Sequence, residues 1–299
     1  MIRTHQWTAA LLMAGAFGAL WLKHRALREA RIKLRRQESA LRLRAKREEW
    51  IAATTTELLS SLLADNPFHH STTLAKRFQD DVESWRATQS FSKVVDTASE
   101  LATAEVLLAS LGEAEALTYE PGSKKDPKLD FRIHRASGRY EWVEVKTVSP
   151  HWNDDKERWE RYQYFSFPQN ASFVAERNFA GAAILGQAFN ARRTFIDKTV
   201  EIEKKVLRMP ADTKGPAWIL FCSNGFDWDV YDLEDFADFY RRGIPRTDDS
   251  ISCVGDQHIA TKGYLFNRSI AGFHYLERQA YDVHAKEVKW DVCGPQFDR

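Results

Sequence analysis

Cysteine is scarce in this chain. The 299 residues hold three cysteines, Cys222, Cys253 and Cys293, and no two of them form a C-x-x-C pair. This spacing argues against a zinc knuckle and against a small scaffold stapled by disulfides. We therefore expect reduced, structural thiols. With 43% hydrophobic residues, the chain can bury a core of its own.

Acidic residues are nearly absent from one segment, Lys23–Arg47. This segment carries eleven Lys and Arg side chains against two Glu, a net charge of +9. Residues 48–299 carry 31 basic and 40 acidic side chains, a net charge of −9, although the net charge of the whole chain is only +1. A body this acidic is no general polyanion-binding surface, so we expect any contact with nucleic acid to be local.

Charge is absent altogether from Trp7–Leu22. These 16 residues would measure about 24 Å as a helix, against about 30 Å for the hydrocarbon core of a bilayer. Trp7 and Trp21 lie where an interfacial aromatic belt would place them, and the stem of Lys23 would lengthen the span. We predict that residues 1–22 form a single transmembrane anchor, and that the basic run after it holds the body on the cytoplasmic side.

Two other interpretations of the uncharged stretch remain open. Ala14-Gly15-Ala16 resembles a signal-peptide cleavage site, although only about seven apolar residues precede it and the mature chain would begin densely basic. The stretch would also suit a helix that is buried in the protein or bound to a partner.

Glycine and proline are absent from Lys23–Leu63, which predicts a long helix that Asn66 and Pro67 end. We assign residues 23–70 to a basic helical stalk and residues 71–299 to one globular domain with a C-terminal extension. Leucines recur every seven residues along the stalk, at Leu20, Leu27, Leu34 and Leu41. The stalk would suit a solvated spacer, a short coiled coil that makes the chain a homodimer, or contact with anionic lipid headgroups.

The segment Lys128–Lys146, with the sequence KLDFRIHRASGRYEWVEVK, has the pattern of a β-hairpin. Gly138 supplies the flexibility that the turn needs. If the turn is centred on Ser137, Asp130 on the first strand faces Glu144 on the second, because both are seven residues from the centre. The hairpin therefore sets one carboxylate against another.

The alternation of side chains along the hairpin predicts that the two carboxylates share one face of the sheet. Apolar residues Leu129, Phe131 and Ile133 share one face of the first strand, so Asp130 lies on the opposite face with Glu144. At a Cβ separation of about 5 Å, two carboxylates repel by about 3 kcal/mol in an effective dielectric of about 20. The pair needs a cation, a shared proton or a different register.

A hard divalent cation such as Mg²⁺ would make the facing pair tolerable, because it prefers oxygen ligands and keeps several waters. The carboxylates of Asp130 and Glu144 and the backbone carbonyl of Val145 would suit it. Lys146, two residues beyond Glu144, would stand beside an outer water of the ion.

A second acidic residue is predicted to point inward. The apolar residues of Val94–Leu111 fall on one helical face, closed by Gly112, and Glu100 lies on that same face. A glutamate directed at a sheet is costly unless something pairs with it. The alternative is a glutamate near the helix start that the helix dipole favours.

Further strands are predicted around the hairpin. One covers Ala116–Glu120, and flanking aromatic strands lie within Gly263–Tyr281 and Glu287–Val292. Together with the helix over Val94–Leu111, these strands place the chain in the α/β class.

This arrangement resembles the PD-(D/E)XK nuclease superfamily, the restriction-endonuclease-like fold. In that family the core order is helix, three strands, helix, strand, an aspartate opens the second strand, and the third strand carries a D/E-x-K triplet. The resemblance implies that Phe189–Met209 is the second helix and Ala217–Ser223 the fourth strand. Asp130 matches the aspartate, Glu144-Val145-Lys146 matches the triplet, and Glu100 is similar to the glutamate that many members place on the first helix. The resemblance covers about Val94–Ser223.

The resemblance implies a metal-dependent nuclease that hydrolyses phosphodiester bonds of DNA or RNA. It implies that Asp130, Glu144 and the Val145 carbonyl hold Mg²⁺, and that Lys146 orients the attacking water. Glu100 would support a second ion or the first. Candidate phosphate contacts on the second helix are Arg192, Arg193 and Lys198. The alternative is a membrane-anchored binding or scaffold module on the same fold, without catalysis.

Overall fold

The computed structural model describes residues 2–64, 67–88, 90–120, 128–148, 195–210, 215–223, 230–242, 266–278 and 281–293. The chain divides into two compact units, Met1–Glu49 and Trp50–Arg299.

The first unit is made by the helix α1 (Ile2–Ala53), whose last four residues belong to the second unit. From Lys23 onward no glycine or proline interrupts the helix. Two ion pairs support it, each between residues one helical turn apart. Nε of Arg25 lies 3.0 Å from Glu29, and Nη2 of Arg42 lies 2.6 Å from Glu38. Both pairs are exposed, so each contributes only about 0.2–0.5 kcal/mol.

The prediction of a transmembrane helix in residues 1–22 is wrong. Among the helices of the described residues, none is both long and apolar enough to cross a membrane. The physical reason is the length of the uncharged stretch Trp7–Leu22. Because it is short for a span, any longer window takes in polar residues, either His5 and Gln6 or Lys23 and His24.

The second unit is built on a mixed seven-stranded sheet with the order β1-β2-β3-β4-β5-β6-β7. The strands are β1 (Phe68–His69), β2 (Ala116–Tyr119), β3 (Phe131–His134), β4 (Tyr140–Val148), β5 (Ala217–Ser223), β6 (Gly272–Glu277) and β7 (Glu287–Lys289). Strands β2, β3 and β4 pair antiparallel, as do β6 and β7, whereas β4, β5 and β6 run parallel, as do β1 and β2.

The helices of the second unit are the π-helix η1 (Thr54–Leu59), α2 (Ser60–Leu62), α3 (Ser71–Thr88), α4 (Ser92–Ala109), a helix over residues 195–207, and α8 (Val230–Arg242). From α4 to β5 the described elements follow one another as helix, three strands, helix, strand. The structure is therefore a mixed α/β fold, and β5 has the bounds that the sequence predicts.

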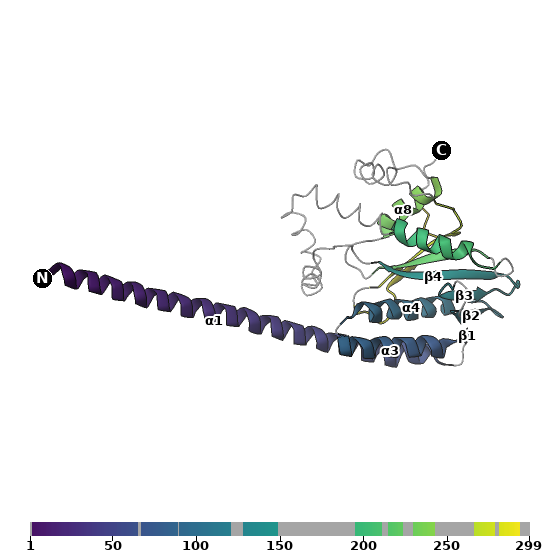
Figure 1. The fold of residues 1–299 in the computed structure, drawn as a ribbon. Helices are drawn as coiled ribbons and strands as arrows, with labels where there is room; N and C mark the ends of the chain where they lie inside the picture. Colours follow the sequence, from purple (N-terminus) through teal and green to yellow (C-terminus); the bar gives the residue numbers. More distant parts are fainter. Residues whose placement is uncertain are drawn as a thin grey trace. The chain divides into compact units, whose positions relative to one another are not determined.

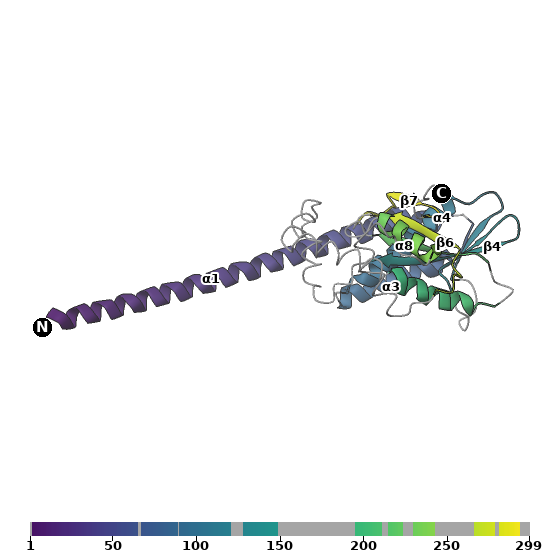
Figure 2. The same cartoon turned by 90° about the horizontal axis from the view of Figure 1, so that it is seen from above.

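Helices cover both faces of the sheet. On one side of β4, α3 and α4 pack against a core that includes Phe131, Val143 and Val145 (Figure 1). On the other side, the 195–207 helix and α8 pack on a core that includes Trp142 and Phe221. The helix α8 lies across β6 (Figure 2). Since side chains alternate along a strand, the even-numbered residues of β4 point toward the 195–207 helix.

A buried carboxylate, that of Glu203, links elements around the core on the side of the 195–207 helix. Glu203 accepts hydrogen bonds from the Tyr240 hydroxyl at 2.7 Å and from the backbone N–H groups of Asn267 at 2.9 Å and Ser269 at 3.2 Å. It lies on the 195–207 helix and is fully buried. It therefore ties that helix to α8 and to the segment before β6.

Replacing Glu203 with alanine is expected to lower the free energy of unfolding by about 3 kcal/mol, because three donors lose their acceptor in the core. Urea denaturation followed by circular dichroism measures the change. The matched variant Glu203→Gln keeps one acceptor oxygen and should cost about half as much. Equal losses in both variants would show that shape, rather than hydrogen bonding, is what Glu203 contributes.

Candidate active site

The hairpin has the register that the sequence predicts. Phe131 lies opposite Val143 in the ladder of β3 and β4, as the predicted register requires, and Asp130 comes directly before the first residue of this ladder. Gly138 makes the turn with a φ of +78°, in the left-handed region that glycine adopts without strain. The ladder stops at Phe131, whereas β4 continues beside β5. Asp130 therefore stands where two strands part.

The Asp130 carboxylate is fixed by the backbone of the facing strand. Its Oδ2 accepts a hydrogen bond of 2.7 Å from the N–H of Val145. Burial raises the pKa of Asp130 well above its usual range, the charges of Glu144 and Glu100 raise it further, and Lys146 opposes them. The repulsion expected from the sequence is thus present, and it disfavours the ionised form of Asp130.

Glu144 is almost fully buried and has two cationic partners. Its Oε1 lies 2.8 Å from Nζ of Lys146 and 2.7 Å from Nζ of Lys205. Its other oxygen, Oε2, is buried and has no hydrogen-bond partner among the described residues. One oxygen of Glu144 therefore holds two ammonium groups, whereas the second is buried and accepts no hydrogen bond from the described residues.

The two lysines differ in origin and exposure. Lys146 belongs to β4 and its side chain is 18% exposed, whereas Lys205 belongs to the 195–207 helix and its side chain is 33% exposed. Burial alone would lower the pKa of Lys146, but Glu144 and Asp130 outweigh it and raise the pKa. Lys146 therefore stays charged at neutral pH.

Glu100 is buried on α4, as its helical position predicts, and it is paired. The Tyr119 hydroxyl donates a hydrogen bond of 2.7 Å to its Oε2, and Nη1 of Arg77 lies 3.1 Å from the same oxygen. Burial raises the pKa of Glu100 to about 7, against the opposing effect of Arg77. Glu100 thus acts on Asp130 through its charge, while its direct partners are Arg77 and Tyr119.

Another carboxylate, Asp96, lies one helical turn before Glu100. The protein around its carboxyl displaces water and raises the pKa of Asp96, although the residue keeps contact with solvent. A hydrogen bond from the Thr147 side chain and the charge of Lys198 oppose this rise in pKa. Lys198, a predicted phosphate contact, is therefore close enough to the site to act on it electrostatically; Arg192 and Arg193 lie outside the described residues.

Sequence reasoning missed Lys205 and Asp96. Lys205 is 61 residues from Glu144 in the chain. Lys205 and Asp96 both lie on helices, where charged side chains are common. The only available signal was position, since Asp96 precedes Glu100 by one turn on α4, and Lys205 lies within the predicted helix Phe189–Met209.

The predicted ligands Asp130, Glu144 and Val145 suit a metal ion only in part. Within the described ranges, no three acidic, histidine or cysteine side chains are grouped so that they could hold one. The buried Oε2 of Glu144 meets no hydrogen-bond donor among the described residues, and Mg²⁺ often takes only one or two carboxylates from the protein. Val145, the third predicted ligand, donates its N–H to Asp130 and pairs with Leu220 of β5. Asp130 and Glu144 thus suit Mg²⁺ better than a metal that needs a full protein cage.

Protein stability is expected to fall as pH rises, partly through Glu100. Its pKa rises from 4.5 in an ordinary carboxyl to about 7 in the folded protein, so its stabilising contribution is complete below about 4.5 and is lost as pH passes through about 7. This loss amounts to roughly 3 kcal/mol. Thermal melting between pH 5 and pH 8 should show a shallower decline for Glu100→Gln than for the wild type.

The exposed Glu113 provides the matched control for this measurement. Glu113→Gln removes one carboxyl that burial does not penalise, so it should keep the wild-type slope. Parallel slopes for Glu100→Gln and the wild type would contradict the assignment.

No family model matches the chain, and comparison with curated proteins and with solved structures gave no match either.

Proposed function

We propose that the second unit is a metal-dependent nuclease that hydrolyses phosphodiester bonds of DNA or RNA. The observation that carries the proposal is the Asp130 carboxylate, held by the N–H of Val145 next to the end of β3 and close enough to feel the charge of Glu144, which itself binds the ammonium groups of Lys146 and Lys205. The elements from α4 to β5 have the order typical of the PD-(D/E)XK superfamily. The Mg²⁺ ligands would be Asp130, Glu144 and the Val145 carbonyl.

Such an ion, when bound, would polarise a phosphodiester oxygen and lower the pKa of a bound water. The chain itself supplies positioning and charge. The N–H of Val145 fixes the Asp130 carboxylate, and Glu144 holds Lys146 through a 2.8 Å ion pair. Lys146, which remains protonated, can orient the attacking water and stabilise the negative charge that develops at phosphorus.

Lys205 extends this arrangement with a second positive charge. It shares Oε1 of Glu144 with Lys146, and a third of its side chain is exposed. We infer that it contacts the phosphate next to the scissile bond, because its partly exposed ammonium can reach a bound strand. Glu100, held by Arg77 and Tyr119, supports the site by its charge.

A binding or scaffold module without catalysis is the second candidate. One observation favours it: two lysines already share one oxygen of Glu144, so much of the carboxylate charge is compensated without a metal. A site that kept this ion pair would hold the fold together without chemistry.

The test incubates the purified full-length chain with supercoiled plasmid, circular single-stranded DNA and RNA, in Mg²⁺, in Mn²⁺ and in EDTA. We expect cleavage of at least one substrate with metal, none in EDTA, and a loss of at least about 100-fold in Lys146→Ala. Lys76→Ala, at an exposed position on α3, is the matched control and should cleave normally. If no substrate is cut and neither ion raises the melting temperature, the scaffold reading replaces the nuclease.

A further inference from the structure

The basic part of α1 carries positive charge that the unit does not neutralise. Two of its basic residues, Arg25 and Arg42, pair with glutamates one turn away. Seven other basic residues of α1 are exposed and form no ion pair with a described residue. They are Lys23, Arg28, Arg31, Lys33, Arg35, Arg36 and Arg44. The proposed nuclease site does not include this positive charge.

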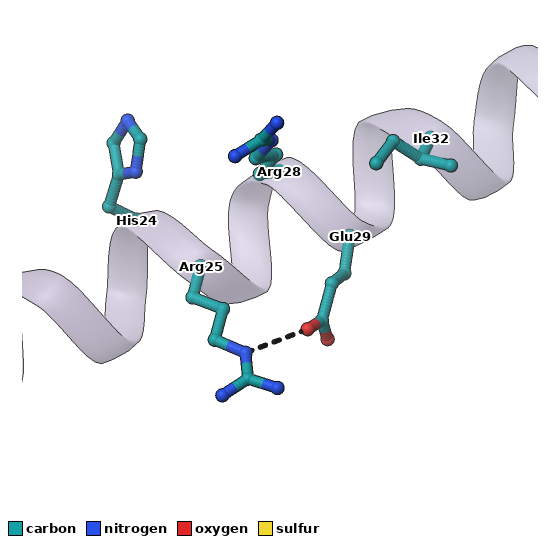
Figure 3. Close-up of a pocket in the computed structure, with 5 residues that line it drawn as sticks. All are labelled: His24, Arg25, Arg28, Glu29 and Ile32. Atoms are coloured by element: carbon teal, nitrogen blue, oxygen red, sulfur yellow. Dashed lines mark hydrogen bonds and ion pairs between the residues drawn. The ribbon is translucent and has the colours of Figure 1, made fainter.

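The charge surrounds the helix instead of forming one face. At about 100° per residue, Arg31 and Arg35 lie on one side of α1, while Lys33 and Arg44 lie about half a turn away. Figure 3 shows α1 one turn earlier, where Arg25 and Arg28 lie only about 60° apart around the helix and Arg25 pairs with Glu29. The hollow drawn there is lined only by residues of this single helix, so it is an open surface and not a ligand pocket.

This distribution decides between possible partners. A helix that lies on an anionic bilayer needs one wide apolar face and one charged face, whereas the exposed leucines of α1 form only the thin stripe of Leu27, Leu34 and Leu41. Pairing with a second copy through that stripe would bring together two segments of charge +9, which repel. The geometry therefore favours a partner with anionic groups on several sides of the helix.

The groove of duplex DNA has this property. Its major groove is about 12 Å wide, admits an α-helix, and is bordered by phosphates on both sides. Lys23–Arg47 spans 25 residues, which is about 37 Å of helix and thus about one turn of the duplex. The deep and narrow major groove of duplex RNA does not admit a helix in this way.

We propose that Lys23–Arg47 of α1 is a duplex-DNA-binding helix whose basic side chains contact phosphates on both sides of the major groove. The inference deepens the proposed function, on which it rests for the choice of substrate. Residues 48–299 carry a net charge of −9 and would repel a polyanion. The basic segment supplies the attraction that the second unit lacks.

The test measures binding of the full-length chain to a fluorescent duplex of arbitrary sequence, by anisotropy, over a range of salt concentrations. EDTA is present, so that binding is separated from cleavage. Two double variants remove charge from opposite sides of α1: Arg31→Gln with Arg35→Gln, and Lys33→Gln with Arg44→Gln. Glutamine is a good helix former, so the helix should persist, and circular dichroism checks this.

In both double variants the slope of log affinity against log salt should become shallower by about 1.8, because each lost phosphate contact removes about 0.9. The matched control, Lys76→Gln with Arg139→Gln, makes the same change of charge at exposed positions of the second unit, and its slope should stay at the wild-type value.

Four results would overturn the inference: unchanged slopes in the α1 variants, an equal change in the control, a change for only one side of α1, or binding to phosphatidylserine vesicles but not to duplex DNA. The two proposals can fail separately. Metal-dependent cleavage without binding through α1 would remove only the DNA-binding helix, and binding without cleavage would remove only the nuclease.

Discussion

The variant Asp130→Asn is expected to lose cleavage activity and to gain stability. Asparagine keeps an oxygen that can accept the hydrogen bond from Val145, but it removes the negative charge that faces Glu144. Without that charge, activity should fall by roughly 1000-fold. Removal of the repulsion should raise the free energy of unfolding by about 1–2 kcal/mol, which is about 3–6 °C in melting temperature.

The stability gain should depend on pH with a definite sign. The pKa of Asp130 is raised in the folded protein, so the wild type loses stability as pH rises above the pKa of the unfolded chain, whereas the variant has no such loss at this position. The difference in melting temperature should therefore be larger at pH 8 than at pH 5.

Two controls accompany the Asp130→Asn measurement. Asp130→Ala also removes the charge but leaves the N–H of Val145 without its acceptor, so it should gain less stability. Addition of Mg²⁺ should raise the melting temperature of the wild type but not of either variant, because the proposed ion site needs the Asp130 carboxylate. An Asp130→Asn protein that is fully active, or less stable than wild type in EDTA, would sink the assignment.

The hairpin and its carboxylates could be predicted because local rules decide them. A turn at Gly138 and strict alternation along β4 leave one register in which the apolar residues face a core, and that register brings Asp130 near Glu144 although the ladder itself ends at Phe131. Helical periodicity likewise placed Glu100 on the buried face of α4. These signals lie within a few residues of the side chains that they place.

The partners of the carboxylates could not be predicted, because they come from distant parts of the chain. Lys205 reaches Glu144 and Arg77 reaches Glu100 only after the sheet brings their helices together. One local prediction also failed. Leu129 packs with Trp142 on the far side of the sheet from Phe131, because β3 begins only at Phe131 and the chain bends at Asp130. Strict alternation held inside the strand and broke at its end.

The variant Glu144→Gln should lose activity like Asp130→Asn but change stability in the opposite direction. Glu144 is the carboxylate that Lys146 and Lys205 share, so its neutralisation leaves two ammonium groups side by side. Removing one partner of a fully buried ion pair costs about 3–5 kcal/mol. Because both lysines are partly exposed here, we expect a smaller loss of about 2 kcal/mol, measured by urea denaturation in EDTA.

A second substitution tests the reason for this loss. Lys205→Met keeps the apolar stem on the 195–207 helix and removes one of the two charges, so the double variant Glu144→Gln with Lys205→Met should recover about half of the lost stability while staying inactive. Lys204→Met, one residue away and exposed, is the matched control and should recover nothing. If the Glu144 and Lys205 effects simply add, the two residues are not coupled, and Glu144 does not hold the lysines in place. Opposite stability changes in the two variants would show that the Asp130 carboxylate destabilises the folded protein and that the Glu144 carboxylate stabilises it.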